Sequence, residues 1–274
     1  MSSGHPAVPA ARFLPYLTWT QVRDLPPDTV AVQQVAATEQ HGPHLPVFTD
    51  VLIGQAVLAA ALERLPASAP VYALPPLAYG KSNEHRGFPG TIFLSADLLY
   101  RTLLEVGTSV HTWSIRRLVL LNTHGGNRPV VDLAARDIRD ATGLITFAIH
   151  SGALGHGGTL SAAEEEFGLH AGDAETSIMM AAYPDLVRAI PATRQYPAPR
   201  AAGIEAPRFR ASRGEAQFAW LTRDLSDSGV VGDPAAASAE KGRRIIAARA
   251  ERLAALLLEA AAWEGPTQAG GRRE

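Results

Sequence analysis

Short apolar runs rich in β-branched residues alternate along this chain with longer amphipathic segments. The runs are TVAVQQVAA, PVYALPPLAY, RRLVLLN and LITFAIH, and the segments between them include DVLIGQAVLAAALERL, SADLLYRTLLEVGTSVHTWS and PVVDLAARDIRDATG. A strand that is apolar nearly throughout is buried on both faces, and long helical connections suit parallel neighbours. The chain is therefore predicted to be an α/β protein with a mostly parallel sheet covered by helices on both faces.

Some segment ends and loops also follow from the sequence. Ser95 is expected to cap the helix that follows it, and a last long helix is expected from about Ala235 to Trp263. Two regions, 151–173 and 196–218, are rich in Gly, Pro and charge without clear periodicity, so we expect loops over the sheet. The charge runs Glu164–Glu166 and Arg208–Arg213 are expected to be solvated, and the tail 265–274 to be frayed.

Composition excludes several classes of partner. With 274 residues, 46% of them hydrophobic and 19% charged, we expect one domain over 1–274 with an ordered core of about 14–264. A net charge of −2 without a basic cluster argues against nucleic acid. There is no apolar run long enough for a membrane span and no signal-peptide pattern, so we expect a cytoplasmic protein. Since cysteine is absent, any metal ion must be held by His, Asp and Glu.

Candidate ligands gather where the predicted strands end. Glu39 and His41 follow the first strand at i, i+2 spacing, which puts both on one face if strand geometry persists. Asp50 opens the next helix, and His124 follows the strand RRLVLLN. In open α/β sheets, ligands bind outside the carboxyl ends of the strands. A further group, HAGDAETS, carries His170 and places Glu175 in the first turn of a helix.

Each of these residues also has an ordinary structural explanation. A lone His at a strand end is commonly a hydrogen-bonded structural residue, and an acidic residue in a first helical turn favours the helix dipole. Several such residues at the mouth of one sheet shift the balance toward a functional site. We expect only structural roles for the histidines that lie elsewhere: His5, His111, His150 and His156.

Four motifs, in order and spacing, resemble the creatininase (creatinine amidohydrolase) family. They are EQHGPHLPVFTD, YGKSNEHRGFPGTIFLS, NTHGGN and HAGDAETS, followed late in the chain by GVVGDPAAASAEKG. The resemblance covers roughly residues 17–258. It implies a three-layer αβα sandwich, often assembled as a homo-oligomer such as a hexamer, and a metal-dependent hydrolase of C–N bonds.

The resemblance also implies a two-metal centre. Its ligands would be Glu39, His41, His124 and a bridging Asp50, holding two divalent ions such as Zn, Mn or Fe. Creatininase takes a fifth ligand two positions after the His124 equivalent, where this chain has Gly126. Glu175 is the expected replacement, because relatives with a Gly-Gly turn keep a Glu in this motif. A water bridging the two ions would attack the substrate carbonyl.

Other residues receive roles in proton transfer and substrate binding. His170 is the candidate proton shuttle to the departing nitrogen, because a neutral imidazole titrates near the working pH. The substrate pocket is expected to be lined by residues of the second motif and of the Gly-Gly turn: Ser82, Glu84, His85, Gly125 and Asn127.

Departures from creatininase bear on the substrate. Gly125 stands where creatininase has a Tyr, and residues 151–170 contain no Trp, so a flat ring would lose its stacking surfaces. We therefore expect a non-creatinine substrate, namely an amide, a formamide or a peptide. The alternatives are a true creatininase that interconverts creatinine and creatine, and a catalytically silent member acting as a sensor or scaffold. Thr123 replaces a usual Gly and would be strained if its φ were positive.

Overall fold

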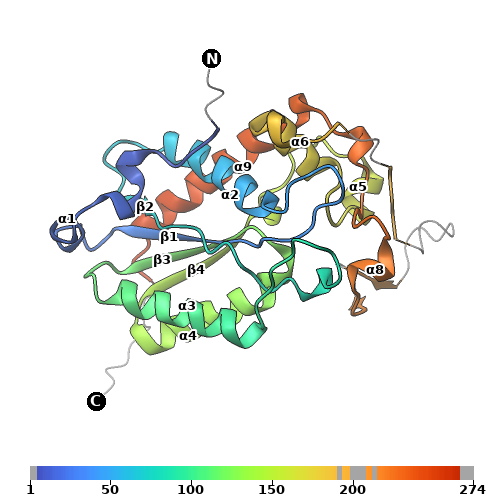
Figure 1. Cartoon of the computed structure of the whole chain (residues 1–274). Coiled ribbons are helices and arrows are strands. Elements are labelled where there is room, and N and C mark those ends of the chain that lie inside the picture. Colours follow the sequence, from blue (N-terminus) through green and yellow to red (C-terminus); the bar gives the residue numbers. More distant parts are fainter. Residues whose placement is uncertain (1–4, 190–192, 198–207, 212–214, 266–274) are drawn as a thin grey trace.

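The computed structural model describes residues 5–189, 193–197, 208–211 and 215–265 (Figure 1). Its centre is a four-stranded, fully parallel sheet in the order β2-β1-β3-β4. The strands are β1 (Val30–Val35), β2 (Val71–Ala73), β3 (Arg117–Asn122) and β4 (Ile145–His150). A separate pair joins β5 (Phe209–Arg210) to β6 (Ala216–Gln217).

The helices alternate with these strands along the chain. The α-helices are α1 (Trp19–Arg23), α2 (Thr49–Glu63), α3 (Ala96–His111), α4 (Arg128–Thr142), α5 (Ala162–Phe167), α6 (Asp173–Ala182), α8 (Thr222–Leu225) and α9 (Ala239–Ala262). The short 3-10 helices are η1 (Ala10–Arg12), η2 (Leu14–Tyr16), η3 (Asn83–His85), η4 (Gly125–Asn127), η5 (Ser151–Leu154), η6 (Pro184–Leu186) and η7 (Pro234–Ala236).

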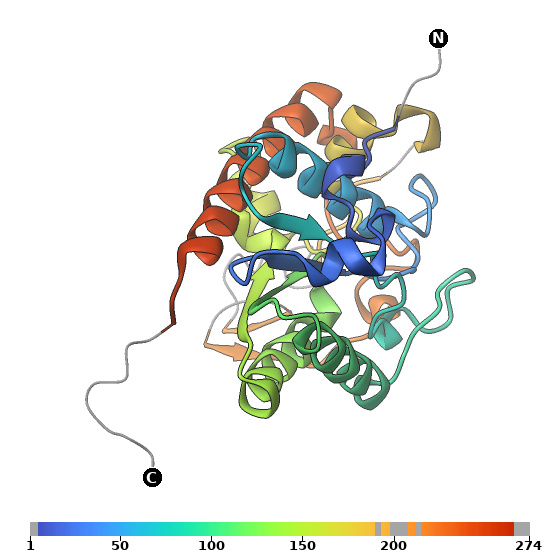
Figure 2. The same cartoon turned by 90° about the vertical axis from the view of Figure 1, so that its left-hand side faces the viewer.

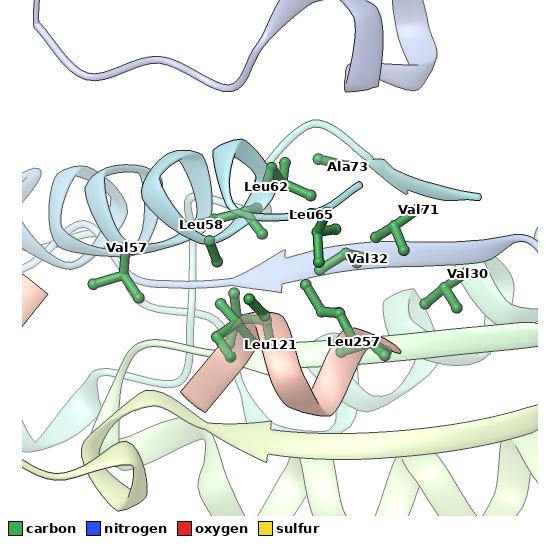
Figure 3. Packing of buried hydrophobic residues seen from close by; sticks show 14 of the residues in the cluster. Val30, Val32, Val57, Leu58, Leu62, Leu65, Val71, Ala73, Leu121 and Leu257 are labelled. Atoms are coloured by element: carbon green, nitrogen blue, oxygen red, sulfur yellow. The ribbon is translucent and has the colours of Figure 1, made fainter. Parts of the chain in front are cut away.

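Helices cover both faces of the sheet, as Figures 1 and 2 show. On one face α2 and α9 pack on alternate strand residues such as Val30 and Val32, which Figure 3 shows among the leucines of those helices. On the other face α3 and α4 pack on the intervening residues, including Ala31 and Leu118. The predicted α/β class with a parallel sheet between two helical layers is therefore confirmed.

The caps and bounds of two helices test the predictions in detail. Ser95 caps α3 as expected, because its hydroxyl accepts the backbone N–H of Leu98 at 3.2 Å. The last helix starts later than predicted, at Ala239, because Ser238 caps it and η7 occupies the residues before. Among the described residues, no helix is long and apolar enough to cross a membrane.

The segment 151–173 was predicted to be a loop, and this was only partly right. It contains η5 and the six-residue α5, which Ser161 caps through the backbone N–H of Glu164 at 3.2 Å. Glu164 is buried rather than solvated, and its carboxylate accepts the backbone N–H groups of Asp173 (2.8 Å) and Asp233 (2.9 Å). It therefore ties the start of α6 to the loop before η7.

The second predicted run of solvated charge is also partly wrong. Arg210 forms an ion pair with Glu166, and both side chains are only partly exposed. Arg208 is exposed, whereas Arg213 lies outside the described residues, as does most of the tail.

Helix α6 is held closely against α9. A Cβ added to Gly242 would lie 1.8 Å from the carbonyl oxygen of Ser177, so no larger residue fits at this contact. Beside it, the Lys241 ammonium contacts the Asp173 carboxylate at 2.6 Å. These contacts fix the N-terminal turn of α6, which carries part of the candidate site.

Candidate metal centre

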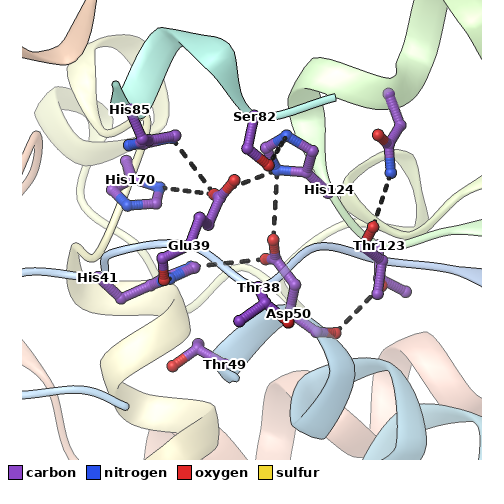
Figure 4. Close-up of polar contacts among 12 residues, drawn as sticks. Thr38, Glu39, His41, Thr49, Asp50, Ser82, His85, Thr123, His124 and His170 are labelled. Atoms are coloured by element: carbon purple, nitrogen blue, oxygen red, sulfur yellow. Dashed lines mark hydrogen bonds and ion pairs between the residues drawn. The ribbon is translucent and has the colours of Figure 1, made fainter. Parts of the chain in front are cut away.

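Ionisable side chains from five segments converge at the carboxyl edge of the sheet, and Figure 4 shows Glu39, His41, Asp50, His124 and His170 among them. Glu39 and His41 follow β1, Asp50 is the second residue of α2, and His124 follows β3. His170 lies in the turn before α6. From the first turn of that helix comes Glu175, as the sequence predicted.

Glu39 and His41 meet for a different reason than the one expected. β1 ends at Val35, so strand alternation does not aim them. The chain instead turns back at Gly42, whose φ is +67°, and His41 pairs with Leu45 in an isolated bridge. The loop geometry, rather than a strand face, brings both side chains to the centre.

The first group of possible ligands is Glu39, Asp50 and His124. Nδ1 of His124 lies 3.2 Å from Glu39 Oε1 and 3.2 Å from Asp50 Oδ2. All three residues are buried, and their ligand atoms are close enough to hold one metal ion.

The second group is His41, Asp50 and Glu175. Nε2 of His41 lies 3.5 Å from Asp50 Oδ1 and 3.9 Å from Glu175 Oε2. The two groups therefore use different oxygens of Asp50, which is the geometry that a bridging carboxylate requires. Glu175 Oε2 also accepts the backbone N–H of Ala171 at 2.6 Å, and the side chain stays 28% exposed.

A third group overlaps both and includes His170 with Glu39 and His41. Nε2 of His170 lies 2.6 Å from the carbonyl oxygen of Gln40, so this nitrogen carries a proton and donates it. Nδ1 is then the nitrogen that faces the centre, 3.7 Å from Glu39 Oε1. This geometry suits a proton acceptor and also suits a ligand.

Unsatisfied buried atoms indicate that the centre is built for cations. Among the described residues, the buried side-chain atoms without a hydrogen-bond partner include Glu39 Oε1 and Oε2, His41 Nε2 and Asp50 Oδ2. Buried polar atoms are normally paired, because an unpaired one costs free energy. Carboxylate oxygens and imidazole nitrogens are ligands for Zn, Mn and Fe. The residues present therefore fit a metal centre.

The pKa values in the metal-free chain agree with a concentration of negative charge. Burial acts to raise the pKa of Glu39, yet the imidazoles of His124 and His85 lower it well below its usual range. Burial acts to lower the pKa of His41, but Asp50 and then Glu175 raise it to about 9. The positive charge of protonated histidine balances the negative charge of the carboxylates here, and a metal ion would have to displace these protons.

His170 behaves in the opposite way. Burial lowers its pKa, and the neighbouring His41 and His85 lower it further, well below the usual range. The ring is therefore neutral near pH 7, with a free Nδ1 lone pair facing the centre.

The residues of the second motif lie beside the centre. Nε2 of His85 is 3.3 Å from Glu39 Oε1, and its Nδ1 is within 2.9 Å of Gln40 Nε2 and Thr222 Oγ1. Ser82 is fully buried, with its hydroxyl 3.4 Å from His124 Nε2.

The two glycines of the turn after His124 have different surroundings. A Cβ on Gly125 would meet no atom within 4 Å, so this position borders open space. Asn127 is fully buried, and its side-chain amide accepts from Lys81 N (2.8 Å) and donates to Ala36 O (3.0 Å). The Asn127 amide therefore holds the backbone at Lys81 and Ala36 together. The substrate contacts expected for Gly125 and Asn127 stay predictions.

Two residues that contact the centre were not predicted from the sequence. Gln40 orients both His170 and His85, and it lies within the first motif, so its position offered a signal. Thr222, the first residue of α8, is fully buried against His85 but belongs to a segment with no recognisable pattern. Only the fold places it at the site.

Comparisons with known proteins agree with this arrangement. The profile of the family described as Creatininase: Creatinine amidohydrolase matches residues 15–257. A mycofactocin precursor peptide peptidase from Mycolicibacterium smegmatis is 37% identical over 215 residues, which cover 78% of each chain. A creatinine amidohydrolase from Pseudomonas putida is 34% identical over 195 residues, covering 64% of this chain and 73% of that protein.

Solved structures show the same fold. A candidate creatinine amidohydrolase from Bacteroides fragilis superimposes with a TM-score of 0.77 at 26% identity, covering 94% of this chain and 99% of that one. A manganese form of creatininase gives a TM-score of 0.70 at 28% identity, covering 90% of this chain and 98% of that one.

The bridging geometry of Asp50 generates a first prediction. Asp50→Ala removes an oxygen from each of the two ligand groups, so we expect loss of both bound ions and of hydrolysis. Metal content by mass spectrometry checks this, with Asp140→Ala, on the exposed face of α4, as the control. Two ions bound to Asp50→Ala at wild-type affinity would contradict the bridge.

A second prediction concerns Glu175. In Glu175→Gln the amide oxygen can still accept the N–H of Ala171, so the turn is kept while the ligand charge is lost. Because even outer partners of ligands contribute about 10- to 100-fold in affinity, one site should weaken by about tenfold or more. Titration with Mn²⁺ measures both sites, and Glu251→Gln on α9 is the control. If Glu175 serves only the helix dipole, both affinities will stay at the wild-type value.

Proposed function

This chain belongs to the creatininase family of hydrolases that act on C–N amide bonds, and from that premise we propose that it hydrolyses a peptide or a related non-creatinine amide with two divalent metal ions. The observation that carries the two-ion proposal is the placement of the two Asp50 oxygens in separate ligand groups. Creatininases solved in a manganese form and in a Zn–Zn form support Mn or Zn as the ions.

The peptide assignment rests on relatives and on the space around the site. Curated relatives that are 34–37% identical are named mycofactocin precursor peptide peptidases, and some alignments cover 90% of this chain. Gly125 borders open space, which suits an extended substrate better than a small ring that needs stacking partners. The resemblance to the family implies a homo-oligomer, and we propose that the whole chain forms one domain of such an assembly.

Each side chain of the centre has a proposed role. Glu39, Asp50 and His124 would hold one ion, and His41, Asp50 and Glu175 the other. The ions would supply an activated water and polarise the substrate carbonyl. His170 would take up a proton at Nδ1 and pass it to the departing nitrogen, since Gln40 keeps its Nε2 occupied.

An assay of the metal-loaded protein tests this proposal. The protein, loaded with Mn²⁺ or Zn²⁺, is incubated with a panel of short peptides, with formamides and with creatinine, and the products are identified by mass spectrometry. We expect cleavage of a peptide or open-chain amide and no interconversion of creatinine and creatine. Conversion of creatinine with all other compounds intact would identify a true creatininase. Two bound ions without any turnover would favour a silent family member.

The role of His170 yields a separate prediction. If His170 is the proton shuttle, His170→Ala should keep both ions and lose about 10²- to 10⁴-fold in turnover. His111→Ala, at the exposed end of α3, serves as the control. Loss of an ion would instead make His170 a ligand of the group with Glu39 and His41, and unchanged turnover would make it structural.

A further inference from the structure

The two ring nitrogens of His124 face different surroundings. Nδ1 points to the ligand oxygens of Glu39 and Asp50. Nε2 points away from them, toward the carbonyl oxygen of Lys81 at 3.1 Å and the carboxylate of Glu84 at 3.4 Å. Because a neutral imidazole carries one N–H, acceptors at Nε2 hold the proton there and leave the Nδ1 lone pair for an ion.

Glu84 is fixed in this place. It lies in η3, its side chain is only 12% exposed, and Oε2 accepts from the Lys81 ammonium at 3.1 Å. Its other oxygen, Oε1, is the one that faces His124. The carboxylate is therefore held between a cation and the imidazole.

Gly126 is the residue that makes room for this carboxylate. A Cβ at this position would lie 2.0 Å from Glu84 Oε1, 2.5 Å from His124 Nε2 and 2.5 Å from the carbonyl oxygen of Lys81. Such distances are far below van der Waals contact, so any side chain at 126 would have to displace these groups. The conformation of Gly126 requires no glycine by itself, since its φ is not among the positive values of the described residues.

We infer that Glu84 is a positioning residue for His124: its carboxylate, 3.4 Å from Nε2, favours the proton on that nitrogen and so leaves Nδ1 as the ligating nitrogen, and Gly126 leaves the space that Glu84 fills. The inference rests on the proposed function in that His124 binds an ion. A carboxylate behind a ligating imidazole fixes the ring and raises the basicity of the other nitrogen. The Lys81 carbonyl accepts the Nε2 proton at 3.1 Å, and the Glu84 carboxylate places negative charge beside it.

The competing role for Glu84 is the one that its motif suggested, a wall of the substrate pocket. A substrate contact would change KM and leave the metal affinity intact. A positioning role would lower the metal affinity even without substrate. The two roles therefore separate in a binding measurement on the chain without substrate.

Calorimetric titration of the metal-free full-length chain with Mn²⁺ tests the inference. Glu84→Ala should weaken one of two sites by about 10- to 100-fold, the usual effect of losing such a partner, and leave the other within about twofold. Glu84→Gln keeps the shape and an acceptor oxygen, so it should fold like the wild type and lose less. Glu251→Ala, on the exposed side of α9, is the control and should bind two ions without loss.

A double-mutant cycle tests the link to Gly126. Gly126→Ala should weaken the same site as Glu84→Ala, and the loss in the double variant should be smaller than the sum of the two single losses, because the added Cβ displaces the Glu84 carboxylate. Additive losses would overturn the link. Wild-type affinity in Glu84→Ala together with a raised KM would overturn the positioning role. A wild-type chain that binds no Mn²⁺ or Zn²⁺ would instead refute the proposed function.

Discussion

Both carboxylate oxygens of Glu39 and Oδ2 of Asp50 are buried without the hydrogen bonds that burial normally requires, and much of the surrounding structure serves to hold these carboxylates in place. Moving a carboxylate out of water costs several kcal/mol unless positive charge accompanies it. In the metal-free chain that charge comes from protons on His41 and His124, whose pKa values are raised. The centre therefore depends on cations, either as protons or as metal ions, and these two compete for the same atoms.

Rigid supports outside the centre keep these charges in place. The start of α2 carries Asp50 and is held by two hydrogen bonds. The Thr123 hydroxyl donates to the Asp50 carbonyl at 3.0 Å, and Gln34 Nε2 donates to the Val51 carbonyl at 3.1 Å. Thr123 does not have a positive φ, so the strain considered for it does not occur. Gly54 must lack a side chain, because a Cβ there would lie 2.0 Å from Gln34 Nε2. Thr123, which replaces a usual Gly of the family, thus helps to hold the start of α2.

Local sequence patterns predicted the sheet and most of the centre, because hydrophobic periodicity and strand-end position are properties of short segments. The carboxyl ends of β1 and β3 lie at one edge of the parallel sheet, so Glu39 and His124 were expected to meet. The contacts that could not be predicted join distant segments. In the sequence, Glu164 is one acidic residue of a charged run. It is buried because the start of α6 and the residue before η7 pack against it and donate backbone N–H groups to its carboxylate. Thr222 likewise gains its contact with His85 across more than a hundred residues.

The two adjacent glycines after His124 have opposite consequences for chemistry. At Gly125 the absence of a side chain leaves open space beside the centre. At Gly126 the space is already filled by Glu84, so the acidic group reaches the far side of His124 from another segment of the chain. An acidic ligand cannot then extend from position 126 while Glu84 stays in place, and Glu175 on α6 is the carboxylate that faces His41 instead. Under the proposed function, the glycine that would leave room for substrate and the glycine that would exclude a ligand side chain lie in one turn, which would couple substrate choice to the architecture of the metal centre.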